Sequence, residues 1–324
     1  MGTFYKKNFA INSPLFLILL LGCLVLGFLF RQEIVMPSAL PASHIQTLSR
    51  FGLTQKFVTS ASTFFFWVEF ILSVGTIVAL YFLGQNIVGK TAGICAAFTF
   101  AVYPYFISNL YSVNIFLIFS FVMYLLFMYI GVHSMGKIWN FIAGMFFMIV
   151  CIIDPSVILL GLLPYIYFLI KQKHIAVLNS FLFFLLGIIL MLGLFTLIAS
   201  LKGSLSNFMP ISDSILAFWN GIQTFFSNPT LYVTEIIWPY LKNTFAYPLV
   251  GGNYSYLHYI IITLSILGAL YSFVNENVRI LSIFLLVMLF QAFFMPFEYV
   301  IIFIILIMLS SFMIDKVIKD VFQI

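Results

Sequence analysis

Apolar runs long enough to cross a membrane recur along the whole chain. A helix needs about 20 apolar residues to span the roughly 30 Å hydrocarbon core of a bilayer. On this basis the sequence predicts ten crossings, over residues 14–30, 63–83, 92–108, 114–132, 139–153, 156–170, 178–200, 255–273, 280–295 and 298–314. We therefore expect an all-α polytopic membrane protein, built as a single integral membrane domain over residues 1–324.

Composition excludes a water-soluble globular fold. Charged residues make up 7% of the chain, whereas soluble domains carry about 25%. Polar side chains are too few to cover a surface that faces water. The three cysteines all lie inside apolar runs, so they predict neither a disulfide framework nor a metal site.

Loop charges predict the orientation of the crossings. Ten crossings place both termini on one side, and that side carries nine basic and three acidic residues, whereas the other side carries five of each. Membrane proteins concentrate Lys and Arg in their cytoplasmic loops. We expect both termini to be cytoplasmic, in a membrane such as the bacterial inner membrane. Orientation explains the basic excess, so we expect no nucleic-acid partner.

This orientation places the two long loops, 31–62 and 201–254, on the outer face. Long loops tend to carry function, whereas the short inner connections leave little room for a site. The second loop contains two amphipathic stretches, Ile215–Trp219 and Ile236–Tyr240, whose Trp and Tyr residues suit the headgroup layer. We expect short helices there, on the outer surface.

Residues Gly84–Thr91 match the phosphate-binding pattern G-x-x-x-x-G-K-T. That pattern binds phosphate where it follows a core strand and opens a helix of a soluble domain. Here it connects two apolar runs at the inner face. We therefore interpret its glycines as turn or helix-ending residues and Lys90 as an inner-face anchor.

Carboxylates near the outer face are the candidate reactive groups. Glu69 lies inside the second run, where an ionisable residue is either functional or hydrogen-bonded to another span. Glu33 follows the first run and Glu298 opens the last, and each is a candidate general base or metal ligand, with a solvated loop charge as the alternative. Asp154 and Pro155 separate two short runs, which predicts a break at a membrane surface.

Basic residues of the outer loops are the candidate phosphate ligands. They are Arg50, Lys56, Lys202 and Lys242, and their alternative role is general attraction to anionic lipids. The four histidines show no metal-ligand spacing, so each is expected to be interfacial or hydrogen-bonded. None of these residue patterns indicates a cofactor, and whether the protein binds a divalent metal ion is left open.

Short features follow one another in order between Leu80 and Ile170. They are Tyr81–Gly89, Ala92-Gly93, Ala96-Ala97, Pro104, Tyr111–Asn114, Lys137, Gly144, Asp154-Pro155 and Pro164. Further on, Pro296–Tyr299 leads into the last run. This order resembles the membrane glycosyltransferases of the GT-C class, in particular the group of protein O-mannosyltransferases and aminoarabinose transferases. The residue likeness covers less than a third of the chain, and the rest is a likeness in topology.

The resemblance implies transfer of a sugar from a polyprenyl-phosphate donor to an acceptor at the outer face, by an inverting displacement. Such a site needs a carboxylate that activates the acceptor, cations that hold the departing phosphate and an apolar groove for the lipid tail. We expect Glu33 to be the catalytic carboxylate and Arg50 and Lys56 to bind the donor phosphate. Supporting substrate-binding roles are expected for the other carboxylates, Asp154, Glu298 and Glu69. The expected partners are the lipid-linked sugar and membrane lipids, and a protein partner is left open.

Three positions depart from the pattern of that group and keep two alternatives open. Gln32 and Asn114 stand where the group carries acids, and Asp154 stands where it carries a basic residue. One alternative is a catalytically silent GT-C-like subunit that binds a lipid carrier or a partner protein. The other is a transporter or lipid flippase, because intramembrane carboxylates such as Glu69 and interrupted helices also serve transport.

Overall fold

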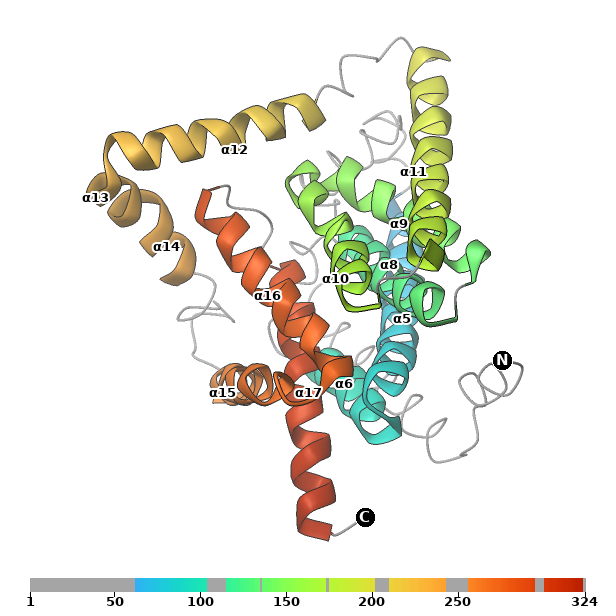
Figure 1. The fold of residues 1–324 in the computed structure, drawn as a ribbon, viewed down its shortest axis with the longest axis vertical. Helices are drawn as coiled ribbons and strands as arrows, with labels where there is room; N and C mark the ends of the chain where they lie inside the picture. Colours follow the sequence, from blue (N-terminus) through green and yellow to red (C-terminus); the bar gives the residue numbers. More distant parts are fainter. Residues whose placement is uncertain are drawn as a thin grey trace.

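The computed structural model describes residues 62–103, 115–134, 136–172, 175–201, 210–242, 256–294 and 300–322, and the regular elements in these ranges are all helical (Figure 1). The α-helices are α5 (Ser62–Ile87), α6 (Lys90–Val102), α8 (Ile115–Ser134), α9 (Lys137–Ile153), α10 (Leu163–Gln172), α11 (Ile175–Leu201), α12 (Pro210–Ser227), α13 (Pro229–Tyr232), α14 (Trp238–Leu241), α15 (Tyr256–Ser272), α16 (Glu276–Phe294) and α17 (Val300–Phe322). A 3-10 helix, η1 (Pro155–Gly161), and a π-helical turn, η3 (Val233–Ile237), complete the set. The all-α prediction is confirmed for the described residues.

Among the described residues, four helices contain stretches long and apolar enough to cross a membrane. These stretches are Trp67–Ile87 in α5, Ile115–Ser134 in α8, Val177–Ile198 in α11 and Ile301–Val321 in α17. The rest of the protein buries only 11% of the apolar stretch of α11, compared with 78% of that of α8. A continuous apolar surface of this kind marks contact with lipid. The protein is therefore an integral multi-pass membrane protein.

Predicted runs and observed helices agree to within a few residues for α8, α9, α11 and α15. The predicted run 156–170 is different, because it forms two elements and not one helix. Pro155 begins the 3-10 helix η1, and α10 starts afresh at Leu163. Pro164 lies in the first turn of α10, where a proline removes no helical hydrogen bond. The predicted run 14–30 lies outside the described residues.

The centre of the bundle is α17, in which every residue from Ile301 to Phe312 is buried. It contacts α5, α6, α8, α15 and α16. Its neighbour α15 runs in the same direction, because contacts follow the same order along both helices: His258 with Phe303, Ser265 with Leu306, Gly268 with Leu309 and Tyr271 with Phe312. Its other neighbour, α6, runs in the opposite direction, from Gly89 beside Lys319 to Tyr103 beside Phe303.

Glycine backbones allow close approaches between helices. Gly84 of α5 meets Gly93 of α6, and a Cβ on Gly84 would lie 2.7 Å from the Cα of Gly93. Gly144 of α9 meets α11 beside Gly187, and a Cβ on Gly144 would overlap the carbonyl oxygen of Phe184. Small residues allow membrane helices to pack closely in this way. These glycines therefore determine where the helices cross.

The segment Gly84–Thr91 connects two apolar helices through a tight turn at Val88 and Gly89. The prediction of a turn residue holds for Gly89 and is wrong for Gly84, which lies inside α5. Helix α5 ends at Ile87, and Gly89 precedes α6 with a φ of 157°, a conformation that L side chains rarely adopt. Lys90 begins α6 and is exposed. Because Gly84 is packed against Gly93 inside a helix pair, this segment is not a phosphate-binding loop.

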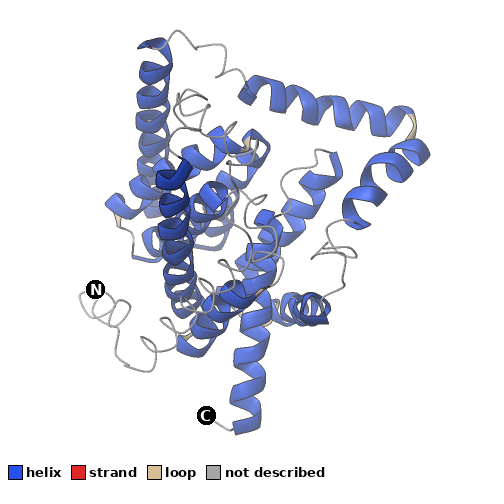
Figure 2. Ribbon diagram, turned by 180° about the vertical axis from the view of Figure 1, so that it is seen from behind, coloured by secondary structure: helices blue, strands red, loops and turns tan. Residues whose placement is uncertain are grey.

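Residues 210–242 project from the other helices, and we call them the arm. In Figure 1, α12 begins near the end of α11 and lies across its direction, and α13 and α14 turn back towards α16. Figure 2 shows the same projection from behind. Both stretches predicted to form short helices, 215–219 and 236–240, lie in helical parts of the arm.

We call the end of the bundle that contacts the arm the arm end. Helix α9 ends there, because η1, which follows it, contacts α12. Helix α16 ends there as well, because Tyr232 of the arm contacts its last residues, and α17 begins a few residues later. Tyr103 at the end of α6 packs on Phe303 near the start of α17. Helix α5, the antiparallel partner of α6, therefore begins at the arm end.

Because α11 faces lipid, a charged side chain placed on its exposed surface should strongly destabilise the protein. Ile189 lies near the middle of α11 and is 63% exposed. We expect Ile189→Arg to destabilise the protein by about 3 kcal/mol, because an arginine at the centre of a membrane helix costs about that much. Leu201→Arg is the matched control, since Leu201 is exposed at the end of α11, where an arginine reaches the headgroup layer. SDS titration in mixed micelles measures both, and equally small effects would show that water covers α11.

Candidate functional site

Asp154 ends α9 at the arm end. Its N–H donates to the carbonyl oxygen of Val150 over 2.8 Å, and its own carbonyl oxygen accepts from the N–H of Val157 over 3.3 Å. Pro155 has no N–H and cannot continue α9, so the chain turns into η1. The Asp154 side chain is half-buried. The helix breaks at the predicted residues, which places a carboxylate at this end of the bundle, and the position of the break at a membrane surface stays a prediction.

Contacts with three helices fix the segment that follows Asp154. The hydroxyl of Tyr124 in α8 donates to the carbonyl oxygen of Leu160 over 3.2 Å. Gly161 leaves space for the ring of Phe147 in α9, which a Cβ would overlap. Helix α12 of the arm also contacts η1. The broken helix therefore lies between the core of the bundle and the arm.

The arm packs on the end of α16 through Phe218, Gly221 and Phe225, which we call the docking face. These residues have i, i+3 and i+7 spacing and so lie on one side of α12. A Cβ on Gly221 would overlap the carbonyl oxygen of Phe294, so only glycine allows this approach. Phe225 packs edge-to-face on Phe293, with ring centroids 5.2 Å apart.

Tyr232 joins the arm to α16 by hydrogen bonds. Its hydroxyl lies 3.0 Å from the carbonyl oxygen of Phe293 and 3.1 Å from that of Phe294, and its one proton serves both. The last carbonyl groups of a helix have no partner within the helix. Burial raises the pKa of the Tyr232 phenol above its ordinary value of 10.0. The phenol is therefore a proton donor at neutral pH.

Two prolines shape the second half of the arm. Asn228 caps α13 by accepting from the N–H of Leu231 over 3.3 Å, and Pro229 takes the first helical position. Pro239 has no N–H for the carbonyl group of Glu235, and the helix widens into the π-helical turn η3 at this point. The result is a helical segment that buries Tyr232 against α16.

We expect Tyr232→Phe to loosen the arm. Loss of the hydroxyl removes about 1 kcal/mol of hydrogen bonding, which corresponds to about fivefold faster amide exchange across residues 210–242. The docked state favours the neutral phenol, so the wild-type arm should loosen as the pH rises above 10.0, and the variant should lack this step. Tyr256→Phe is the control, because Tyr256 is largely exposed. Unchanged exchange in Tyr232→Phe would contradict the hydrogen-bond role.

Glu69 is buried towards the same end of the bundle. It is the eighth residue of α5, which begins at the arm end. Its backbone carbonyl accepts a hydrogen bond from the hydroxyl of Ser73 over 2.8 Å. Helix α8 packs against both α5, which carries Glu69, and α9, which ends at Asp154. Two predicted site residues are thus placed at the arm end by the structure.

The other predicted site residues, Glu33, Arg50, Lys56 and Glu298, lie outside the described residues, as do Gln32 and Asn114. Their positions in the sequence still relate them to described helices. Lys56 comes six residues before α5 begins, and Glu298 comes two residues before α17 begins. Both helices begin at the arm end, and α9 reaches Asp154 at that end.

A buried polar pair at the arm end, Tyr103 and His258, is not singled out by the sequence. The Tyr103 hydroxyl and Nδ1 of His258 are hydrogen-bonded, and the ring of Phe303 packs against both residues. Of the two roles expected for each histidine, interfacial or hydrogen-bonded, His258 has the second. The pair joins the end of α6 to the starts of α15 and α17, and no spacing in the sequence connects two residues so far apart.

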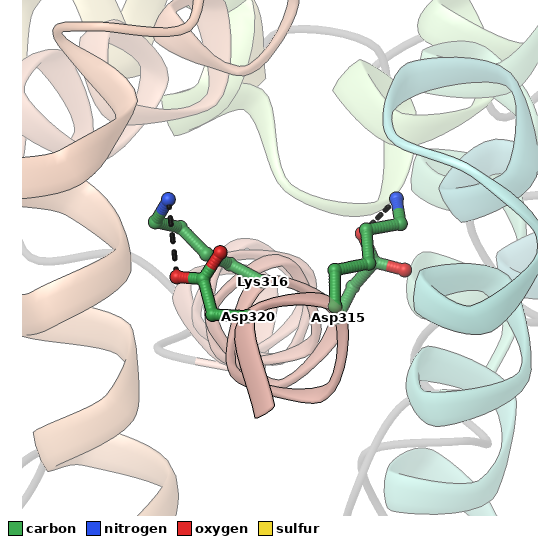
Figure 3. A network of polar contacts seen from close by, with 4 residues as sticks. Asp315, Lys316 and Asp320 are labelled. Carbon is green, nitrogen blue, oxygen red and sulfur yellow. Dashed lines mark hydrogen bonds and ion pairs between the residues drawn. The ribbon is translucent and has the colours of Figure 1, made fainter. Parts of the chain in front are cut away.

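Two ion pairs that were not predicted from the sequence lie at the opposite end of α17 (Figure 3). Asp315 is buried, and its Oδ2 accepts from Nζ of Lys319 over 2.6 Å. Nζ of Lys316 lies 3.4 Å from Oδ2 of Asp320 and 4.1 Å from the centroid of the Tyr271 ring. Asp315 and Asp320 project from different sides of α17. Their i, i+4 spacing is the signal in the sequence that predicts such pairs.

Within the described ranges, no group of three or more His, Cys, Asp or Glu side chains is arranged to hold a metal ion. No protein-family model, curated protein sequence or solved structure matches the chain.

Proposed function

We propose that the protein is a membrane glycosyltransferase of GT-C architecture that transfers a sugar from a polyprenyl-phosphate donor to an acceptor. In this proposal the chain crosses the membrane about ten times, both termini are cytoplasmic and the arm end is the outer face. The supporting observation is the convergence at that end: α9 breaks at Asp154, the arm contacts the break, and the segments that carry Lys56 and Glu298 lead into helices that begin there.

The proposed reaction is a single inverting displacement. Glu33 removes a proton from the nucleophilic group of the acceptor, which attacks the anomeric carbon of the sugar. The bond between that carbon and the phosphate oxygen breaks, and polyprenyl phosphate leaves with the electron pair. Arg50 and Lys56 stabilise the negative charge on the departing phosphate. Asp154, Glu298 and Glu69 support substrate binding at the same end.

A lipid-linked donor needs apolar surface next to the site. Helix α11 has such a surface, because Leu194, Leu197 and Leu201 are exposed along its last turns. The arm begins at Pro210, shortly after α11 ends at Leu201, and contacts η1 beside Asp154. A polyprenyl tail that lies in the bilayer along α11 would therefore bring its phosphate to the level of the arm.

Binding of the lipid phosphate tests this proposal. A ligand that binds only the folded state raises stability by about 2.7 kcal/mol at 100 times its Kd. We expect polyprenyl phosphate to raise the unfolding temperature of the detergent-purified protein, neutral polyprenol to leave it unchanged, and Lys56→Ala to abolish the shift. Lys90→Ala is the matched control, because Lys90 is an exposed lysine at the start of α6, the end of that helix that lies away from the arm end. Equal shifts with both lipids, or none with either, would contradict a donor-phosphate site.

A further inference from the structure

The exposed surface of α12 divides into two stripes that flank its docking face. The apolar stripe consists of Leu216, Trp219 and Phe226, which are 64%, 58% and 75% exposed, and one exposed polar residue, Gln223, lies on the same side between them. The polar stripe consists of Asn220, Thr224 and Ser227, all of them exposed. The spacings are i, i+3 and i+10 for the first and i, i+4 and i+7 for the second, so each set lies along one side of the helix. Helix α12 thus has three surfaces of different chemistry.

Each surface fits a different environment. The docking face is packed on α16 through Gly221 and Phe225. The polar stripe carries no charge, and the hydroxyl groups of Thr224 and Ser227 donate to carbonyl oxygens of their own helix. Large exposed apolar side chains on a neighbouring surface mark contact with a membrane or another protein. A helix with separate apolar and polar sides of this kind lies in the plane of a membrane interface.

The position of α12 selects lipid as the partner. Helix α11 has 27 residues, and at 1.5 Å per residue it is about 40 Å long, whereas the hydrocarbon core is about 30 Å thick. Its exposed apolar surface continues to Leu201, so its end lies at the level of the headgroups. Helix α12 begins close to this end and lies across it (Figure 1). The apolar stripe therefore stands where the lipid-covered surface of α11 ends.

We infer that α12 binds the membrane surface at the arm end, with its apolar stripe among the upper acyl chains and its polar stripe facing water. Tryptophan prefers this boundary because its ring is apolar and its N–H is polar, which suits Trp219. Trp238, in the second half of the arm, is exposed as well. The inference requires a membrane protein and does not depend on sugar transfer.

Fluorescence quenching of Trp219 tests the orientation directly. The full chain carries four tryptophans, and replacing Trp67, Trp139 and Trp238 with Phe leaves Trp219 as the single fluorophore. The variant is reconstituted in phosphatidylcholine vesicles whose lipids carry bromine either near the glycerol end or near the tail end of the acyl chains. We expect the shallow bromines to remove most of the Trp219 emission, the deep bromines to remove less, and aqueous iodide to have little effect.

The matched control moves the fluorophore by one residue. Asn220→Trp with Trp219→Phe places the single tryptophan in the polar stripe of the same turn, so iodide should quench it and brominated lipid should not. If the multiple replacements prevent folding, Trp219→Phe alone in the wild-type background gives the same answer, as a loss of the lipid-quenched part of the emission.

Three results would overturn the inference. Quenching of Trp219 by iodide and not by brominated lipid would place the apolar stripe in water. Shielding from both quenchers would show that protein, such as a second copy of the chain, covers it. Equal quenching of the Trp219 and Asn220→Trp probes would mean that α12 has no fixed orientation at the membrane.

Discussion

Gly144→Ala is expected to destabilise the protein by about 3 kcal/mol, at the upper end of the usual cost of overpacking. The new Cβ would overlap the carbonyl oxygen of Phe184 and lie 2.9 Å from its carbonyl carbon. Backbone atoms cannot rotate out of the way as a side chain can, so α9 and α11 must move apart. Phe184, whose ring packs against Tyr124, Phe147 and Tyr165, would lose these contacts.

Gly193→Ala is the matched control for this prediction. Gly193 also lies in α11, and a Cβ there would meet no atom within 4 Å. Alanine is favoured over glycine in a helix by about 1 kcal/mol, so this variant should be neutral or slightly more stable. Gly187→Ala acts at the same helix crossing as Gly144→Ala. The double variant should therefore lose less stability than the sum of the losses in the two single variants. Equal unfolding midpoints for Gly144→Ala and Gly193→Ala would show that the two helices do not pack as described.

Glu33→Gln is expected to lower sugar transfer by about 100-fold or more, because a positioned general base contributes about that much. The amide has nearly the same shape as the carboxylate and cannot accept the proton. Binding of polyprenyl phosphate should be unchanged, because the proposal assigns that contact to Arg50 and Lys56. The measurement is the initial rate of transfer from a lipid-linked sugar by protein that retains the wild-type unfolding temperature.

Glu235→Gln supplies the control for this variant. Glu235 is an exposed carboxylate of the arm, on the same side of the membrane in the proposal, and has no assigned role. Its replacement should leave the transfer rate unchanged. Equal rates for wild type and Glu33→Gln would remove Glu33 from the mechanism. Equal losses in both variants would mean that general outer-face charge, and not a specific base, sets the rate.

The predicted runs 114–132, 139–153 and 178–200 match α8, α9 and α11 to within three residues at each end, because each helix is one unbroken apolar run. The break at Asp154 is also predictable, since proline and a carboxylate both act locally. Its extent is not, because the 3-10 geometry of η1 depends on Tyr124 and Phe147 from other helices.

Contacts between distant segments are beyond what the pattern of apolar residues predicts. The docking face of the arm depends on the meeting of Gly221 with the end of α16, which no local spacing indicates. The pairing of Tyr103 with His258 depends on α15 and α17 running in the same direction. In the sequence Asp315 is one of several charges near the end of an apolar run. In the structure it is buried and paired with Lys319. Apolar residues that recur every 3.6 positions show which face of a helix is buried. They do not show which other helix packs against that face.

Donor turnover by the wild-type protein tests the central proposal most directly. The protein is reconstituted in liposomes with a panel of polyprenyl-phosphate-linked sugars and candidate acceptors, and release of free polyprenyl phosphate is measured. The proposal predicts release that requires folded protein and is lost in Glu33→Gln. If folded protein binds polyprenyl phosphate and yet releases none from any donor, it is a silent lipid-binding relative and not a transferase.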